Sequence, residues 1–310
     1  MHTPFLLEPM RKIQILPRLF SCHFSVGYLQ SVIISNFKIM NIKIIITIAL
    51  LMILASCTKI VEIDLNEADP KIVVDAYAQE EGILNNRSEK LYAKFTRSVS
   101  IYEDVYPEAF SGLDVYATND QGDHHKLNWN AYDSSYTYTN IISDLDDEVI
   151  EWTIETTIEN INIKSKTSIP NYVAIDSILA VKLPYGPPVD GLSPIVFFTD
   201  LPGEANYYRL KLTINGELIR GLFITRDDGF DGKQIVYPFM NVGVSKGDIM
   251  KVTLLAIDEF SFEYYKVIMQ NMGGGFTAAP GNPYSNIEGD NTIGIFTGQT
   301  MSEAIREVNY

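Results

Sequence analysis

The sequence predicts a mainly β protein made of two β-sandwich-like units, with one short helix in the second unit. Tyrosine and phenylalanine are abundant, at 18 and 15 of the 310 residues, and aromatic and β-branched residues favour strands. Short apolar–polar alternations recur between residues 71 and 257, with turn residues between them. A single segment, 258–272, has the apolar spacing of a helix.

Residues 71–170 are expected to form the first sandwich, which we predict to be immunoglobulin-like. Its strands are expected at 71–78, 91–98, 113–117, 136–139, 149–158 and 161–169. The segment NDQG at 119–122 predicts a hairpin turn, because Asn and Gly accept the positive φ of a tight turn. Short strands at this spacing are typical of a sandwich of roughly a hundred residues.

Pro170-Asn171 marks the expected start of a second β unit, residues 171–310. Its strands are expected at 175–183, 207–214, 217–225 and 249–257. Asn215-Gly216 lies between two alternating runs and is the strongest hairpin signal in the chain. The expected helix, near 259–272, has an apolar stripe of Phe260, Tyr264, Val267 and Ile268 and ends before Gly273.

An apolar segment precedes both units. Residues 44–57 read IIITIALLMILASC, with Lys43 just before them. The run has the length of a signal-peptide core and is shorter than the about 20 residues that a membrane-spanning helix needs. Its end resembles a bacterial lipobox, which predicts cleavage between Ser56 and Cys57 and a lipid on the Cys57 thiol. Residues 40–57 are therefore expected to be a lipoprotein signal peptide, and 58–70 a tether.

Residues 1–39 lie upstream of this signal. Export signals stand at the extreme N-terminus, so we interpret 1–39 as a start assigned too early, with Met40 the initiator; the alternative is a genuine extension. The chain has two cysteines, Cys22 and Cys57. A start at Met40 leaves Cys57 alone, with no intramolecular disulfide.

The charge of the chain disfavours nucleic acid as a partner. The whole sequence has a net charge of −15, and without residues 1–57 it keeps 19 Lys+Arg against 38 Asp+Glu, a net charge of −19. Such a surface repels phosphate backbones.

Sequence motifs of catalysis are missing. The chain has no G-x-S-x-G, P-loop or H-E-x-x-H motif. His124 and His125 are adjacent, and on a strand they point to opposite faces, so they are poorly placed to share a metal ion. We expect no enzyme activity, no catalytic residue and no cofactor.

Two acidic clusters are the candidate cation sites. One is Asp144, Asp146, Asp147 and Glu148, and the other is Asp227, Asp228 and Asp231 within RDDGFDGK. Neither has the spacing of an EF-hand, and Asp and Gly are ordinary turn residues. The sequence alone favours solvated hairpin tips that bind no metal.

Aromatic residues are a further candidate for binding. Trp129, Trp152 and the many tyrosines have the chemistry of a sugar-stacking face, but aromatic residues in strands more often pack in the core.

An ordered series of short motifs resembles one family. The motifs are KIVV at 71–74, IDS at 175–177, FTDLPGEANYYR at 198–209, Gly247-Asp248, FEYY at 262–265, SNIEG at 285–289 and GIF at 294–296. Together with the lipobox they resemble the domain-of-unknown-function 4249 family of Bacteroidota envelope lipoproteins. One departure is the segment DNT at 290–292, between SNIEG and Gly294.

The resemblance implies an outer-membrane lipoprotein, often encoded near a TonB-dependent transporter, and it implies no catalytic residues. We therefore expect a non-enzymatic binding or accessory subunit of an envelope uptake complex, held to the membrane by its lipid. An adhesin or structural envelope module is the first alternative, and an uncharacterised hydrolase is the second.

Overall fold

The computed structural model describes residues 69–82, 87–100, 105–142, 151–187, 189–272 and 281–309. By its internal contacts the chain divides into Met1–Ala68 and Asp69–Tyr310, and the described residues all lie in the second unit. Strands dominate these segments, and α2 (Glu259–Met272) is the one helix within them, which confirms the mainly β prediction.

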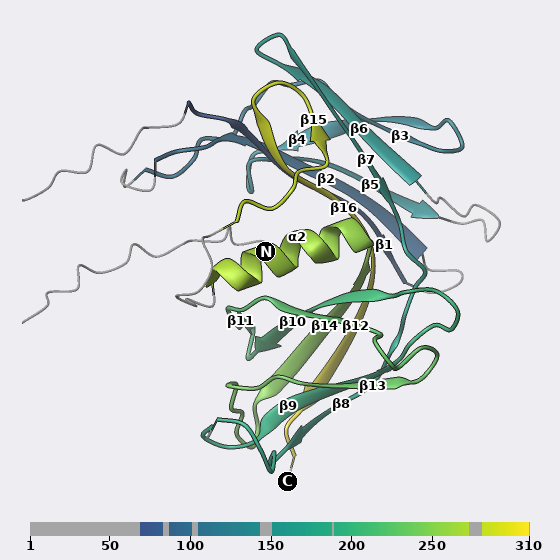
Figure 1. Ribbon diagram of the computed structural model, residues 1–310, viewed down its shortest axis with the longest axis vertical. Helices are drawn as coiled ribbons and strands as arrows, with labels where there is room; N and C mark the ends of the chain where they lie inside the picture. Colours follow the sequence, from purple (N-terminus) through teal and green to yellow (C-terminus); the bar gives the residue numbers. More distant parts are fainter. Residues whose placement is uncertain are drawn as a thin grey trace, which may run out of the picture. The chain divides into compact units, whose positions relative to one another are not determined.

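The strands form two sheets. Before residue 170 they are β1 (Ile72–Glu81), β2 (Arg87–Arg97), β3 (Val115–Asn119), β4 (His124–Asn130), β5 (Ser135–Ile142), β6 (Glu151–Ile158) and β7 (Ile161–Ser168). After it they are β8 (Ile175–Val181), β9 (Ser193–Thr199), β10 (Tyr207–Ile214), β11 (Glu217–Leu218), β12 (Phe223–Arg226), β13 (Gln234–Pro238), β14 (Ile249–Ile257), β15 (Ile287–Glu288) and β16 (Thr292–Glu307). The large sheet has the order β11-β10-β14-β16-β1-β2-β5-β4-β3-β6-β7-β15, with β12 beside β10, and the small sheet has the order β13-β9-β8 (Figure 1).

The long strand β16 joins the two halves of the large sheet. It pairs in parallel with the whole of β1, from Ile72 opposite Thr292 to Glu81 opposite Met301. Its other edge pairs antiparallel with β14. Between β1 and β16 the buried Gln299 amide donates a hydrogen bond to the Gln79 side-chain oxygen (2.6 Å). Residues that are more than 200 positions apart in the sequence are thereby held in one register.

Two large hydrophobic cores lie on this framework, besides a small cluster at helix α2. The first collects buried side chains of β1 to β7, with Trp152 and Tyr136 among the largest, and includes Phe296 of β16. The second collects side chains that follow residue 172, including Phe198, Tyr208 and Leu254, with Ala304 of β16 packed against it. Because β16 contributes to both cores, the domain boundaries 71–170 and 171–310 stay a prediction.

Strand β4 links the two layers around the first core. Its first residues pair with β3, up to Leu127 opposite Val115, and its last residues pair with β5, from Asn128 opposite Thr137. A strand that changes partners in this way forms a corner between layers. His124 and His125 lie in this strand and stack on Tyr116 and Tyr138 respectively, so their side chains point to opposite faces as expected.

Helix α2 begins at a capped N-terminus. The Asp258 carboxylate accepts hydrogen bonds from the Ser261 N–H (2.7 Å) and hydroxyl (2.8 Å), and so satisfies a free donor of the first turn. The helix packs on β16 and β10 (Figure 1). Its buried aromatic residue is Phe262, at 6% exposure, whereas Phe260 of the predicted stripe is 36% exposed. The predicted stripe is therefore wrong at Phe260, whereas its other members, Tyr264, Val267 and Ile268, are half-buried.

The Asn215-Gly216 hairpin is confirmed, with φ of 52° and 85° at its two turn residues. The single strand expected at 217–225 is wrong, since the chain leaves the sheet at 219–222 between β11 and β12. Gly221 lies against the Phe223 ring there, where a Cβ atom would be 2.7 Å from a ring carbon. Glycine in a strand interior often marks such a close approach.

Candidate functional site

On the side of β1 that faces away from the first core, one acidic and one aromatic side chain are accessible to solvent. Val74, Ala76 and Ala78 point into the first core, so Asp75 and Tyr77 point to the opposite side of the sheet. Across the antiparallel pair, Asp75 lies opposite Lys94 and Tyr77 opposite Tyr92. The β1–β2 ribbon therefore carries an acid, a base and two aromatic rings on one face.

Strand β10 adds two cations to the same face. Tyr208, Leu210 and Leu212 belong to the second core, so Arg209 and Lys211 point away from it. Opposite residues of paired strands share a face. Arg209 lies opposite Leu255, Leu255 opposite Met301, and Met301 opposite Glu81. Arg209 and Lys211 are thus on the side of the sheet that carries Asp75.

Helix α2 borders this surface. Phe262 packs against Leu255 and Ile257, and the Arg209 guanidinium lies 4.3 Å from the centroid of the Tyr265 ring. Tyr264, beside it on the helix, meets Tyr265 edge to face. We call the surface made by Asp75, Tyr77, Lys90, Lys94, Arg209, Lys211 and Tyr264 the Asp75 face.

Desolvation shifts the pKa values of three groups on the Asp75 face. The Asp75 side chain is exposed to solvent, yet desolvation by the surrounding protein raises the pKa of its carboxyl, against the opposing effects of Arg209, Lys211 and Lys94. Desolvation and then Arg209 lower the pKa of Lys211 to about 8, and desolvation raises that of Tyr264 to about 12. The charges of this face are therefore incompletely hydrated.

The charges of the Asp75 face come from strands that are not neighbours in the sheet. Strands β10 and β1 are separated by β14 and β16 in the sheet, three strand spacings or about 14 Å along a flat sheet. Arg209 and Lys211 nevertheless act on the pKa of Asp75. Arg209 and Lys211 therefore belong to the electrostatic surroundings of Asp75.

The Asp75 face has the opposite sign to the chain as a whole. Lys90, Lys94, Arg209 and Lys211 lie on one face with the Asp75 carboxylate. Two further acids act on this face: desolvation and then the charges of Asp75 and Asp133 raise the pKa of Tyr92, and Glu303, which pairs with Lys251 (2.8 Å), acts on the pKa of Lys211. Against a chain charge of −15, this is a local positive region that attracts anionic groups.

Aromatic rings accompany these charges. The Tyr77 and Tyr92 rings stack with their centroids 4.9 Å apart and an interplanar angle of 8°, and the Lys90 ammonium lies 5.9 Å from the Tyr77 centroid. Ring faces next to cations suit a ligand that has both a ring and an anionic group.

A second titratable cluster lies at the far end of the β1–β2 ribbon. Glu80 and Glu89 are cross-strand partners and both are buried. Burial and then the charge of Glu80 raise the pKa of Glu89 to about 7, while Arg87 pairs with Glu80 (2.5 Å). The charge of Glu80 is therefore balanced by Arg87, and Glu89 is neutralised by a proton at moderately acidic pH.

The sequence did not single out the Asp75 face. Its signal is the alternation in IVVDAYA and YYRLKLTI, where a charged residue stands between two buried ones. Such a residue indicates the solvated face of a strand, and only the pairing through β14 and β16 shows that the two segments share it.

The structure regroups one of the predicted acidic clusters. Asp227 and Asp231 lie together with Asp200, and one carboxylate oxygen of each is within 4.8 Å of the others. Asp228 instead pairs with Arg226 (2.5 Å). The other cluster, Asp144, Asp146, Asp147 and Glu148, lies outside the described residues, as do Ser56 and Cys57.

The tryptophans do not form a common platform. Trp152 is fully buried in the first core. Trp129 is 37% exposed and packs against Tyr136, with the two ring centroids 5.0 Å apart. Trp152 is thus unavailable for stacking on a sugar from solvent.

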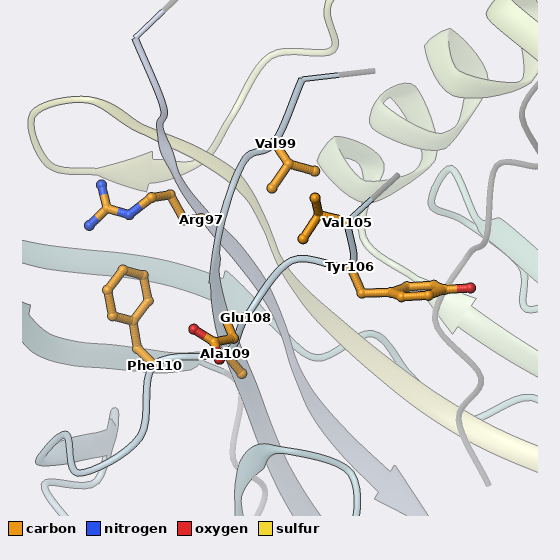
Figure 2. A pocket seen from close by; sticks show the side chains of 7 residues that line it. All are labelled: Arg97, Val99, Val105, Tyr106, Glu108, Ala109 and Phe110. Carbon is orange, nitrogen blue, oxygen red and sulfur yellow. The ribbon is translucent and has the colours of Figure 1, made fainter. Parts of the chain in front are cut away.

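A hollow of about 310 Å³ lies where β2 ends, lined by Arg97, Val99, Val105, Tyr106, Glu108, Ala109 and Phe110 (Figure 2). The Arg97 guanidinium lies 5.3 Å from the Phe110 centroid and pairs with Glu159. Figure 2 shows the Tyr106 ring directed away from the other lining side chains. Arg97 is already paired, and Glu108 is the one other charged residue that lines this hollow. The hollow therefore offers fewer charged groups to a ligand than the Asp75 face does.

Comparison with known proteins places the chain in a family. In the described part of the chain, no helix has both the length and the apolar character needed to cross a membrane. The search of curated proteins returned no match. A family model described as a domain of unknown function, DUF4249, matches residues 58–305, which is most of the chain. The protein therefore belongs to the DUF4249 family.

Proposed function

We propose that this protein is a lipid-anchored, non-enzymatic binding or accessory subunit of the cell envelope, and that it holds its ligand at the Asp75 face. The anchor is the lipid on Cys57, the membrane is the outer membrane, and the assembly it serves is an uptake complex with a TonB-dependent transporter. The lipobox at residues 44–57 and the membership of the DUF4249 family support this proposal.

The observation that supports binding most directly is the charge of the Asp75 face. Four cations share one face of the sheet with Asp75, in a chain that is otherwise strongly acidic. Partly desolvated cations interact more strongly with an anion than cations in open water do. The ligand group we propose is an anion, held by Arg209 and Lys211, next to a ring or apolar group that contacts Tyr77 and Tyr264.

Two alternatives make different demands on the molecule. An adhesin or structural module needs a broad contact surface and does not depend on one charged face. A hydrolase of the glycosidase type needs two carboxyl groups, one on each side of the bond that it cleaves. The buried Glu80–Glu89 pair comes closest to that requirement. Because Arg87 forms an ion pair with Glu80, a structural role is favoured for the Glu80–Glu89 pair.

Co-purification from detergent-solubilised membranes tests the proposal. The protein is compared with a variant that carries Arg209→Ala and Lys211→Ala, and with a control that carries Lys164→Ala and Lys166→Ala. The control lysines lie on β7 and pair with Glu155 and Glu151, so both variants lose two positive charges. We expect an envelope component that is retained by the protein and the control and lost from the Asp75-face variant. Equal retention by all three would contradict the proposal.

A further inference from the structure

The acidic cluster of Asp200, Asp227 and Asp231 is built from two loops at one end of the second core. Asp200 directly follows β9, Asp227 directly follows β12, and Asp231 lies in the turn before β13. The three carboxylates come within 4.8 Å of one another. Asp200 is 2% exposed and Asp227 is 9% exposed, so two of the three acids are removed from bulk water.

Asp227 has no partner for its carboxylate among the described residues. The other two acids have donors within the protein. Asp200 accepts hydrogen bonds from the Tyr208 hydroxyl and from the Gly232 N–H (3.0 Å), and Asp231 accepts one from the Gly203 N–H (2.7 Å). The hydrogen bonds of Asp227 are those of its backbone, from the Phe230 N–H to its carbonyl and from its N–H to the Asn206 carbonyl.

No basic side chain of the described segments forms an ion pair with this cluster. The neighbouring Arg226 pairs with Asp228, and Lys233 is exposed. Holding three carboxylates this close is costly, because like charges repel and two of the three residues are little exposed to water. The cost is removed when a cation occupies the space between the three oxygens.

We propose that Asp200, Asp227 and Asp231 bind a Ca²⁺ ion. The donors are all oxygens, which suit a hard cation, and the site has no histidine or cysteine for zinc. Calcium accepts several oxygens in flexible geometry, whereas Mg²⁺ requires a nearly ideal octahedron and keeps most of its water. The site lies on loops that contain Gly203, Gly229 and Gly232, whose positive φ values let the chain turn around the cluster.

This proposal is the opposite of the sequence-based expectation of a solvated tip. The difference comes from Asp200, which is 27 residues before Asp227 in the chain and was not part of the predicted cluster. Its buried carboxylate replaces that of Asp228, which points to Arg226. The ion would connect the ends of β9 and β12 and so stabilise the smaller sheet against β10.

Terbium luminescence provides a direct test, because Tb³⁺ replaces Ca²⁺ at oxygen sites and emits when a neighbouring aromatic ring is excited. Tyr208 donates a hydrogen bond to Asp200 and is the built-in sensitiser. The full chain, purified in detergent, is titrated with Tb³⁺ and then with Ca²⁺ or Mg²⁺. Asp227→Asn and Asp231→Asn remove ligand charge with little change of shape, and Asp228→Asn is the matched control in the same loop.

We expect sensitised emission that Ca²⁺ displaces, and loss of most of that emission in Asp227→Asn and Asp231→Asn but not in Asp228→Asn. At a hundredfold excess of Ca²⁺ over its Kd, the Tm should rise by about 5 to 10 °C relative to chelator at equal ionic strength. Absence of sensitised emission, or equal emission from Asp227→Asn, would overturn the site. Displacement by Mg²⁺ as effective as that by Ca²⁺ would overturn the assignment to calcium.

Discussion

Asp258 links helix α2 to strand β16 through the backbone of Gly298. One carboxylate oxygen of Asp258 caps the helix by accepting the Ser261 N–H (2.7 Å), and the other accepts the Gly298 N–H (3.1 Å). The second oxygen also accepts the Thr167 hydroxyl of β7 (3.1 Å). Gly298 fits tightly, since a Cβ atom there would lie 1.9 Å from the Ser168 carbonyl oxygen. One side chain thus joins the helix beside the Asp75 face to strands of both halves.

Asp258→Ala should lower the free energy of unfolding by about 2 to 4 kcal/mol, because it removes an N-cap and three further hydrogen bonds to a charged acceptor. Glu263→Ala is the control on the same helix, since Glu263 is exposed and pairs with Lys266 one turn away; its effect should be below about 0.5 kcal/mol. Urea unfolding followed by tryptophan fluorescence measures both. Equal effects of the two substitutions would show that Asp258 does not act as a link.

Glu89 predicts a pH dependence of stability. Its pKa in the folded protein is about 7, above the ordinary value of 4.5, so folding favours the protonated form. The stabilisation is fully present below pH 4.5 and is lost as the pH rises through 7. Glu89→Gln, which cannot ionise, should therefore be more stable than the original protein at pH 8 by about 1 to 3 kcal/mol.

At pH 5 the same substitution should have little effect, because Glu89 is then largely protonated in the folded protein. Denaturant unfolding at the two pH values gives the comparison. Glu155→Gln, on the exposed side of β6, should show a much smaller difference between pH 5 and pH 8. A Glu89→Gln effect that is the same at both pH values would refute the titration of Glu89.

Local signals predicted the parts of the fold that depend on neighbouring residues. Asn215-Gly216 predicted its hairpin because both residues adopt the positive φ that the turn requires, and the strand predicted at 249–257 is β14, whose residues from Val252 to Ile257 are all buried. Strand β16 was missed because it lies between β1 and β14, and its buried positions include Thr297, Gln299 and Ser302. Polar residues in a doubly paired strand give no alternation to detect.

The candidate site could not be predicted for a related reason. Asp75 and Arg209 are 134 positions apart, and no local pattern connects them. Their common face follows from four paired strands in a single register. The acidic cluster shows the same limit on a smaller scale, because RDDGFDGK suggested Asp228 and folding brought in Asp200 instead.

Cys57 is predicted to carry the lipid anchor. Cys57→Ala should release the protein from the membrane fraction or block its processing, because the acylated thiol is removed. Cys22→Ala is the matched control and should change nothing, since residues 1–39 are expected to lie upstream of the true start. Fractionation of cell envelopes with and without detergent makes the measurement. Membrane association of Cys57→Ala that still depends on detergent would contradict the anchor.

The central claim is that the Asp75 face binds a component of the envelope, and photo-crosslinking in intact cells tests it most directly. A photoreactive amino acid is placed at Lys90, on the Asp75 face, and separately at Lys166, on the exposed side of β7. The account predicts a discrete adduct from position 90 that position 166 does not form, and that Lys211→Ala weakens. The same adducts from both positions, or none from position 90, would contradict it.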